Sequence, residues 1–100
     1  MNDLNSVFLV GRVKSVKEAK GEGDNKILTF SLVNNNYSFN ETSKEYEEEQ
    51  TVFSVKYFGK HTKGIQSGFR IGVNGRVVEE DGKIIIRAYA IQILDVPKKE

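Results

Sequence analysis

The chain has 100 residues, with 15 Lys and Arg against 14 Asp and Glu, one His, one Pro, no Cys and no Trp. This length suits a single domain over residues 1–100, and so small a core is often reinforced by oligomerisation. The absence of Cys excludes disulfides, thiolate nucleophiles and zinc–thiolate clusters, and the lone His61 excludes sites that need two imidazoles. We therefore expect no enzyme activity, no catalytic residues, no metal and no cofactor.

Apolar runs in the chain are short, and the longest hold four residues, such as 7–10. A transmembrane helix needs about 20 apolar residues, so neither a membrane span nor a secretory signal is predicted. We expect a cytoplasmic protein without a membrane partner. The net charge of +1 hides an uneven distribution, because residues 41–49, with five Glu and one Lys, contribute −4.

Apolar and polar residues alternate with the period of β-strands over most of the chain. A first strand is predicted over residues 6–19, with Gly11 in mid-strand where a bulge or a sharp bend is expected. The turn at residues 21–25 leads to a second strand over 26–35. A long polar loop is predicted over residues 36–50.

A third strand is predicted over residues 51–58, with Phe53 on one face and both Lys56 and Phe58 on the other. Residues 59–66 lack the β pattern, which indicates a short helix or an irregular connector. A fourth strand over 69–78 leads through Asp81-Gly82, a typical hairpin turn, into a fifth strand over 83–94. Residues 95–100 form a short C-terminal extension. This order predicts an all-β, five-stranded OB-fold barrel, although an SH3-like barrel or a small sandwich also fits.

Stacking on nucleobases is the chemistry that these residues favour. Single-stranded nucleic acid is bound by aromatic faces for the bases and by cations for the phosphates. Lys56 and Phe58 project from one side of the third strand, while Tyr37, Phe39 and Tyr46 stand in an otherwise polar loop. Several cations fall at outward positions or near the bend of the first strand, where they line a groove for the phosphate backbone of the nucleic acid: Arg12, Lys14, Lys17, Arg70 and Arg76. The alternatives are that Phe58 belongs to the core or a subunit interface, and that the loop aromatics fold back on their own domain.

The acidic run, the glutamates within residues 45–49, is the feature that fits a phosphate groove least well, because carboxylates repel phosphates. Glu45, Glu47, Glu48 and Glu49 stand among polar residues without an apolar wall, so they lack the surroundings that a general acid needs. They are typical of a solvated loop. The run can point away from the groove, imitate nucleic acid for a protein partner, or limit non-specific binding.

Four segments resemble the single-stranded DNA-binding proteins of bacteria and phages, which have the OB-fold. Residues 5–13 (NSVFLVGRV) resemble the family's opening N-x-V-x-L-V-G-x-L, and residues 29–33 (TFSLV) resemble its second strand. Residues 49–51 (EQT) and 58–60 (FGK) are similar to its third strand and the F-G-K that closes it, and residues 68–77 to its K-G-x-x-V-x-V-x-G-x-L. The resemblance spans the chain. It implies binding of single-stranded DNA without sequence preference, as a homo-oligomer, usually a tetramer, in replication, recombination and repair.

The resemblance also implies which residues contact DNA. Phe58 matches the family's stacking aromatic in F-G-K, and Lys56 lies on the same face. The family's tryptophans fall at Ser38 and Val52, where neighbouring aromatics can replace them, although Phe53 faces the core or a subunit interface by alternation. The implied DNA-binding residues are Arg12, Tyr37, Phe39, Phe53, Lys56, Phe58, Lys60 and Arg76.

Two alternatives stay open at this point. One is a relative of primosomal replication protein N, an OB-fold dimer without a tail. The other is an OB-fold protein-interaction adaptor that uses the acidic residues 41–49. The family's flexible linker and acidic tail have no counterpart after residue 95, so replication and repair proteins are expected as partners only by another route.

Overall fold

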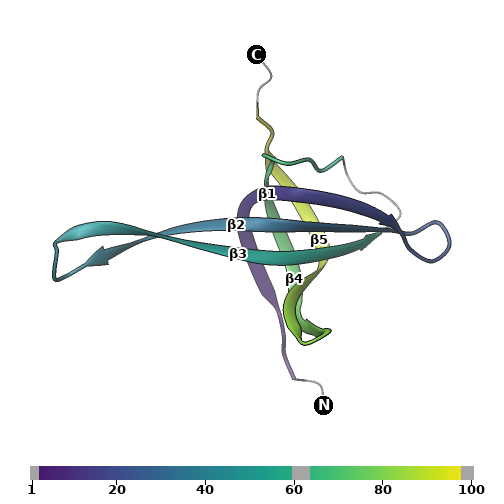
Figure 1. The fold of residues 1–100 in the computed structure, drawn as a ribbon, viewed down its shortest axis with the longest axis horizontal. Coiled ribbons are helices and arrows are strands. Elements are labelled where there is room, and N and C mark those ends of the chain that lie inside the picture. The colour runs from purple at the N-terminus through teal and green to yellow at the C-terminus, as the bar shows by residue number, and fades with distance from the viewer. Residues whose placement is uncertain (1–2, 60–63, 98–100) are drawn as a thin grey trace.

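Five strands form a closed barrel in the computed structural model, which describes residues 3–59 and 64–97. The strands are β1 (Val7–Lys20), β2 (Lys26–Asn40), β3 (Glu45–Gly59), β4 (Arg70–Glu80) and β5 (Lys83–Asp95). Their order around the barrel is β1-β2-β3-β5-β4 (Figure 1). The pairing of β3 with β5 is parallel and the other pairings are antiparallel. The predicted all-β, five-stranded barrel is confirmed and agrees with an OB-fold.

The core follows the predicted alternation along the strands. The largest fully buried side chains are Leu28, Leu32, Ile71, Val13, Val55 and Val73. Burial of a side chain of this size stabilises the fold by about 1.5–3 kcal/mol relative to exposure. Phe53 and Tyr57, which share a face of β3 with Val55, are partly buried and pack against this core. The opposite face of β3 is therefore the outer one.

β1 serves both halves of the barrel. Its residues 7–12 pair with β4, and its residues 12–20 pair with β2. The exchange of partners falls beside Gly11, whose backbone passes so close to β2 that a Cβ there would overlap the carbonyl oxygen of Val33. The bulge lies further along, between Lys14 and Lys17, where Ser15 has a φ of 57°. The glycine thus marks a close approach, whereas the bulge expected at that place is displaced towards Ser15.

The predicted loop over residues 36–50 is wrong, because both strands continue through it. The ladder between β2 and β3 runs without a register shift from Lys26–Gly59 to Asn40–Glu45. We call residues 34–51 the arm, which projects from the barrel at the left of Figure 1. The radius of gyration of 15.6 Å exceeds the ~13 Å of a compact chain of this length. Residues 35–39 and 41–52 are all exposed, so no face is buried and the alternation that reveals a strand is missing.

A side-chain-capped turn closes the arm. The Oδ1 of Asn40 accepts hydrogen bonds from the backbone N–H groups of Thr42 (2.9 Å) and Ser43 (3.2 Å). The N–H of Lys44, which has a φ of 61°, donates to the Asn40 carbonyl at 2.8 Å. Asn side chains favour such turns because they hydrogen-bond to the backbone two residues on. The turn sets the register of the whole hairpin.

The connection from β3 to β4 contains no helix in its described part, residues 64–69. Gly64 (φ 65°) and Gly68 (φ 95°) adopt left-handed backbone conformations, which a right-handed helix does not allow. The Gly68 N–H donates to the Val13 carbonyl at 2.8 Å, and the Val13 N–H donates to the Phe69 carbonyl at 2.9 Å. The irregular connector, rather than the helix, is thus the form seen here. Within the described ranges no helix is long and apolar enough to cross a membrane.

We expect Gly11→Ala to lower the free energy of unfolding by about 1–3 kcal/mol, because the added methyl forces β1 and β2 apart. Urea unfolding followed by circular dichroism measures this change. An unchanged or raised stability would contradict the close approach, since Ala in place of Gly at an unstrained position stabilises by about 0.4–1 kcal/mol.

Candidate nucleic-acid interface

Three cationic side chains lie in a row on the outer surface of the barrel. Lys56 of β3 is the register partner of Arg87 of β5, and Arg87 is the register partner of Arg76 of β4. Directly paired residues project from the same face of a sheet, and neighbouring strands are about 4.8 Å apart. We call these three residues the cationic row. The barrel therefore brings together two predicted site residues, Lys56 and Arg76, and places Arg87 between them.

Phe58 stands next to this row and is the register partner of Ile27. Its side chain is 39% exposed, and the guanidinium carbon of Arg87 lies 4.6 Å from the centroid of its ring. At this distance the cation and the ring attract one another, by about 0.5–1 kcal/mol at an exposed site. Phe58 is thus an outer aromatic, as predicted, and not part of the core cluster.

A cleft of about 610 Å³ opens beside Phe58. It is lined by the β1–β2 turn and the adjoining strands: Lys20, Gly21, Glu22, Asn25, Ile27, Phe58 and Arg87. Sites for small ligands usually measure about 300–1,000 Å³ and combine apolar walls with a few polar groups. The ring of Phe58 and the side chain of Ile27 supply an apolar wall, and the two cations Lys20 and Arg87 outnumber the single carboxylate of Glu22. The cleft therefore suits a flat, partly apolar group that carries negative charge.

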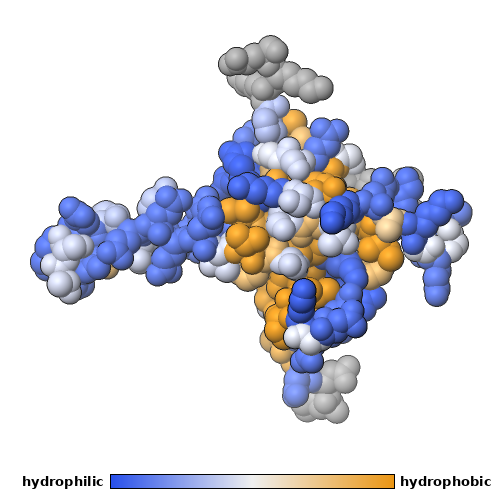
Figure 2. Space-filling view, viewed as in Figure 1, coloured by the Kyte–Doolittle hydropathy of each residue, from blue (hydrophilic) through white to orange (hydrophobic). Residues whose placement is uncertain are grey.

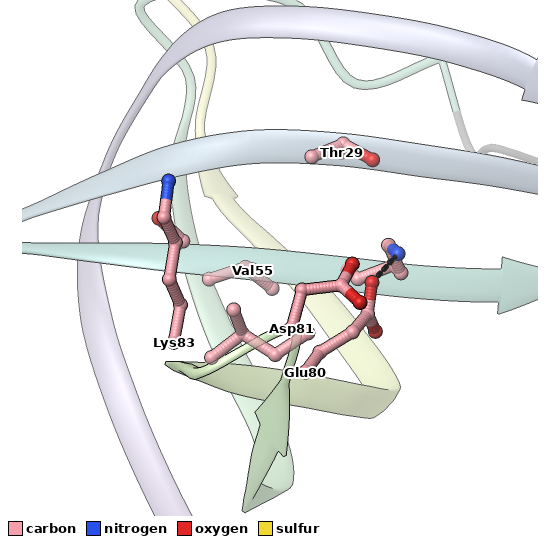
Figure 3. Close-up of a pocket in the computed structure, with 8 residues that line it drawn as sticks. Thr29, Val55, Glu80, Asp81 and Lys83 are labelled. Atoms are coloured by element: carbon pink, nitrogen blue, oxygen red, sulfur yellow. Dashed lines mark hydrogen bonds and ion pairs between the residues drawn. The ribbon is translucent and has the colours of Figure 1, made fainter.

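Lys56 forms an ion pair with Glu80, the last residue of β4 (Figure 3). Arg76 is exposed, and neither it nor Arg87 takes part in an ion pair among the described residues. The cations of the row consequently differ in how freely an external anion can reach them.

Residues that pair across the two strands of the arm project to the same side, and neighbours along a strand project to opposite sides. The arm therefore has two different faces. One face, which we call the aromatic face, carries Tyr37, Phe39 and Tyr46, together with Glu48, the register partner of Tyr37. The rings of Phe39 and Tyr46 lie 5.2 Å apart between centroids. The opposite, acidic face carries Glu45, Glu47 and Glu49. Side-chain hydrogen bonds agree with this division, since Asn40 donates to Glu47 at 2.7 Å on the acidic face.

The register also fixes which face of the arm continues the outer surface of the barrel. Odd-numbered residues of β2, such as Ile27 and Thr29, pair with Phe58 and Lys56 on the outer surface, and the ladder has no shift between them and Tyr37. The aromatic face therefore continues the surface that bears Phe58, whereas the acidic face continues the core side of the strands. Along the arm the surface is hydrophilic, while apolar surface gathers over the barrel (Figure 2).

The exposure of the arm aromatics is large: Tyr37 is 70%, Tyr46 is 76% and Phe39 is 46% exposed. The alternative that they fold back on the barrel is therefore wrong for these residues. Their rings are available to a ligand that follows the outer surface onto the arm.

Two predicted site residues lie elsewhere. Arg12 donates a hydrogen bond to the Gly68 carbonyl at 3.0 Å and lies 3.9 Å from the Asp95 carboxylate, so it ties β1 to the connector and to the end of β5. Phe53 packs against the core, as alternation predicted. Neither belongs to the row or its cleft. Lys60 lies outside the described residues.

Arg87 is the site residue that sequence analysis missed. Ile86 and Ala88 are buried on either side of it, so alternation along β5 could have placed it outward. Its position beside Phe58 could not have been found in this way, because it depends on the parallel pairing of β3 with β5, which are distant in sequence. Among residues 3–59 and 64–97, no three His, Asp or Glu side chains gather where they could hold a metal ion.

No family model matches the chain, and no curated protein sequence matches it. Solved structures do match. A deletion mutant of the single-stranded DNA-binding protein from Thermus aquaticus shares 26% identity with a TM-score of 0.76, covering 92% of this chain and 51% of that one. The predicted resemblance to such proteins is confirmed. This chain spans about half the length of the Thermus aquaticus protein.

Two further structures have the same fold at lower identity. The Plasmodium falciparum single-stranded DNA-binding protein in complex with single-stranded DNA has a TM-score of 0.79 at 20% identity, over 95% of this chain and 98% of that one. PriB from Ralstonia solanacearum has a TM-score of 0.72 at 10% identity, over 91% of this chain and 98% of that one. Both support the barrel topology.

Proposed function

We propose that the protein binds single-stranded DNA without sequence preference and without catalysis. The observation that carries this proposal is the cationic row beside Phe58, on a surface that continues onto the aromatic face of the arm. Aromatic platforms along a positively charged track are how single strands are bound independently of sequence, because every base has a flat face and every nucleotide a phosphate. The structural likeness to proteins named for this activity supports the proposal.

In this mechanism a base stacks in the cleft beside Phe58, and the phosphates that flank it contact Arg87 and Arg76. Arg87 has a double role, because its guanidinium holds one face of the Phe58 ring and its N–H groups remain available to an oxygen ligand. The strand then runs along the outer surface towards Tyr37 and Phe39. We place this activity in DNA replication, recombination and repair.

The acidic face of the arm is compatible with this route. Glu45, Glu47 and Glu49 project from the side opposite to Tyr37 and Phe39, so these three carboxylates do not line the path of the phosphates, whereas Glu48 shares the side of Tyr37. At physiological salt, charges separated by more than about 8 Å are largely screened. The acidic face is also the feature that favours the adaptor alternative, in which it binds a basic protein partner.

The apolar outer side of β1, β4 and β5 supports a homo-oligomer. Phe8 is 59% and Leu94 is 44% exposed, and both side chains lie over Gly72. Exposed apolar residues that gather in one patch mark interaction sites more often than scattered ones do. We propose that a second copy of the chain covers this patch. A dimer would favour the alternative, a relative of primosomal replication protein N, and a tetramer would favour the main proposal.

Phe58→Ala should weaken binding of a fluorescent oligo-dT by about 1–3 kcal/mol, the usual value of one base stack. Arg87→Ala should weaken it too, and the double variant should lose less than the sum of the single losses because the two side chains form one platform. Fluorescence anisotropy across a salt series measures this, with duplex DNA of equal length as the control. Equal affinity of the wild type for single strand and duplex would contradict the proposal.

Substitutions on the two faces of the arm should act differently. Tyr37→Ala with Phe39→Ala should weaken oligo-dT binding by about 1–3 kcal/mol for each base that stacks there. The charge-neutralising triple variant Glu45→Gln, Glu47→Gln and Glu49→Gln should leave the affinity unchanged or raise it slightly. Weaker binding by the triple variant, with no effect of the aromatic pair, would reverse the assignment of the two faces.

Phe8→Arg should reduce the size of the assembly, because a charge buried in an apolar contact without a partner is costly. Light scattering coupled to size-exclusion chromatography measures the mass, and Phe39→Arg on the arm is the matched control. A monomeric wild type, or an unchanged assembly of the Phe8→Arg variant, would show that this patch is not the interface.

A further inference from the structure

The ion pair between Lys56 and Glu80 joins two strands, β3 and β4, that are not neighbours in the barrel. Glu80 is the last residue of β4, and the β4–β5 hairpin brings its carboxylate over β3 to the ammonium of Lys56 (Figure 3). The Lys56 side chain is 24% exposed and that of Glu80 is 43% exposed. Glu80 is therefore the more exposed partner, and its carboxylate holds the ammonium group that an external anion would need.

The ion pair lies in a cleft of about 270 Å³. Besides Lys56 and Glu80, the residues that line it are Thr29, Ser54, Lys83, Asp81, Val55 and Ile85. Thr29 is the register partner of Lys56 on the outer surface. Hydroxyl and ammonium groups donate hydrogen bonds to phosphate oxygens in the same way as to carboxylate oxygens. Thr29, Ser54, Lys56 and Lys83 thus supply side chains of the kind that donate to a phosphodiester, and Lys56 is already paired with Glu80.

We propose that this cleft is a phosphate subsite, and that the Glu80 carboxylate occupies it while no DNA is bound. The inference rests on the proposed function. A phosphate of the strand takes the place of Glu80 on Lys56, so one ion pair breaks when another forms. Lys56 therefore adds little net affinity in the wild type, although it lies in the row with Arg76 and Arg87. Glu80 sets how tightly the strand is held.

A neighbouring carboxylate, Glu79, serves as a control for the effect of Glu80 on the affinity for DNA. Glu79 precedes Glu80 on the same hairpin, is exposed, and forms no ion pair among the described residues. Asp81 lines the cleft but does not contact Lys56 in an ion pair within the described part of the chain. Glu79→Gln thus removes the same charge from the same hairpin without freeing Lys56, which makes it the matched control for Glu80→Gln.

The experiment is the affinity for oligo-dT of the wild type, Glu80→Gln and Glu79→Gln, each also in a Lys56→Met background. We expect Glu80→Gln to bind about two- to fivefold more tightly than Glu79→Gln at low salt, a size typical of a partly exposed ion pair. The advantage should shrink as salt is added. With Lys56→Met, the two Gln variants should have the same affinity, because no ammonium is left to be freed.

The outcomes separate this inference from the function on which it rests. If the wild type binds oligo-dT and Glu80→Gln gains no more than Glu79→Gln, Glu80 is no competitor and only this inference is overturned. A weaker Glu80→Gln would make Glu80 a residue that positions Lys56, which also overturns it. If neither the wild type nor Glu80→Gln binds single strands, the proposed function fails, and this inference fails with it.

Discussion

The uninterrupted register between β2 and β3 is the constraint on which the rest of this structure depends. Because side chains alternate along a strand, one slip in the ladder would move every residue of the arm to the other face. The register runs from the barrel to the turn at Asn40, where backbone and side-chain hydrogen bonds close the hairpin. Through this single alignment, Phe58 on the barrel and Tyr37 on the arm belong to one continuous surface, and Glu47 belongs to the other.

The same alternation separates the charges of a nearly neutral chain. The net charge is +1, yet Lys56, Arg87 and Arg76 meet in one row, while Glu45, Glu47 and Glu49 of the arm project from the opposite side and only Glu48 shares the side of Tyr37. A small domain that binds a polyanion does not need a large overall charge when its cations are concentrated along the path of the ligand. The pairing of Lys56 with Glu80 goes further, because it places an acid within the path itself.

The segment that was predicted wrongly, the arm, is the one in which neither side of the strands is buried. The strands of the barrel were predictable because their inner faces pack on one core, so apolar residues recur at every second position. The arm has no buried face, and its strands were predicted as a loop. Residues 59–66 were predicted as a short helix or an irregular connector, and the described part is irregular, because the glycines at 64 and 68 take left-handed conformations that the pattern alone does not reveal.

The sequence by itself determined the all-β class, the inward and outward faces of the barrel strands, and the place of Phe58 and Lys56 on one outer surface. These features depend on the period of the strand, which is a local property. Only the tertiary structure decided that Arg87 lies against Phe58, that Arg12 ties the connector instead of lining the site, and that Glu80 covers Lys56. Each of these contacts joins residues that are far apart in sequence, and closure of the barrel, not local alternation, sets the distance between them.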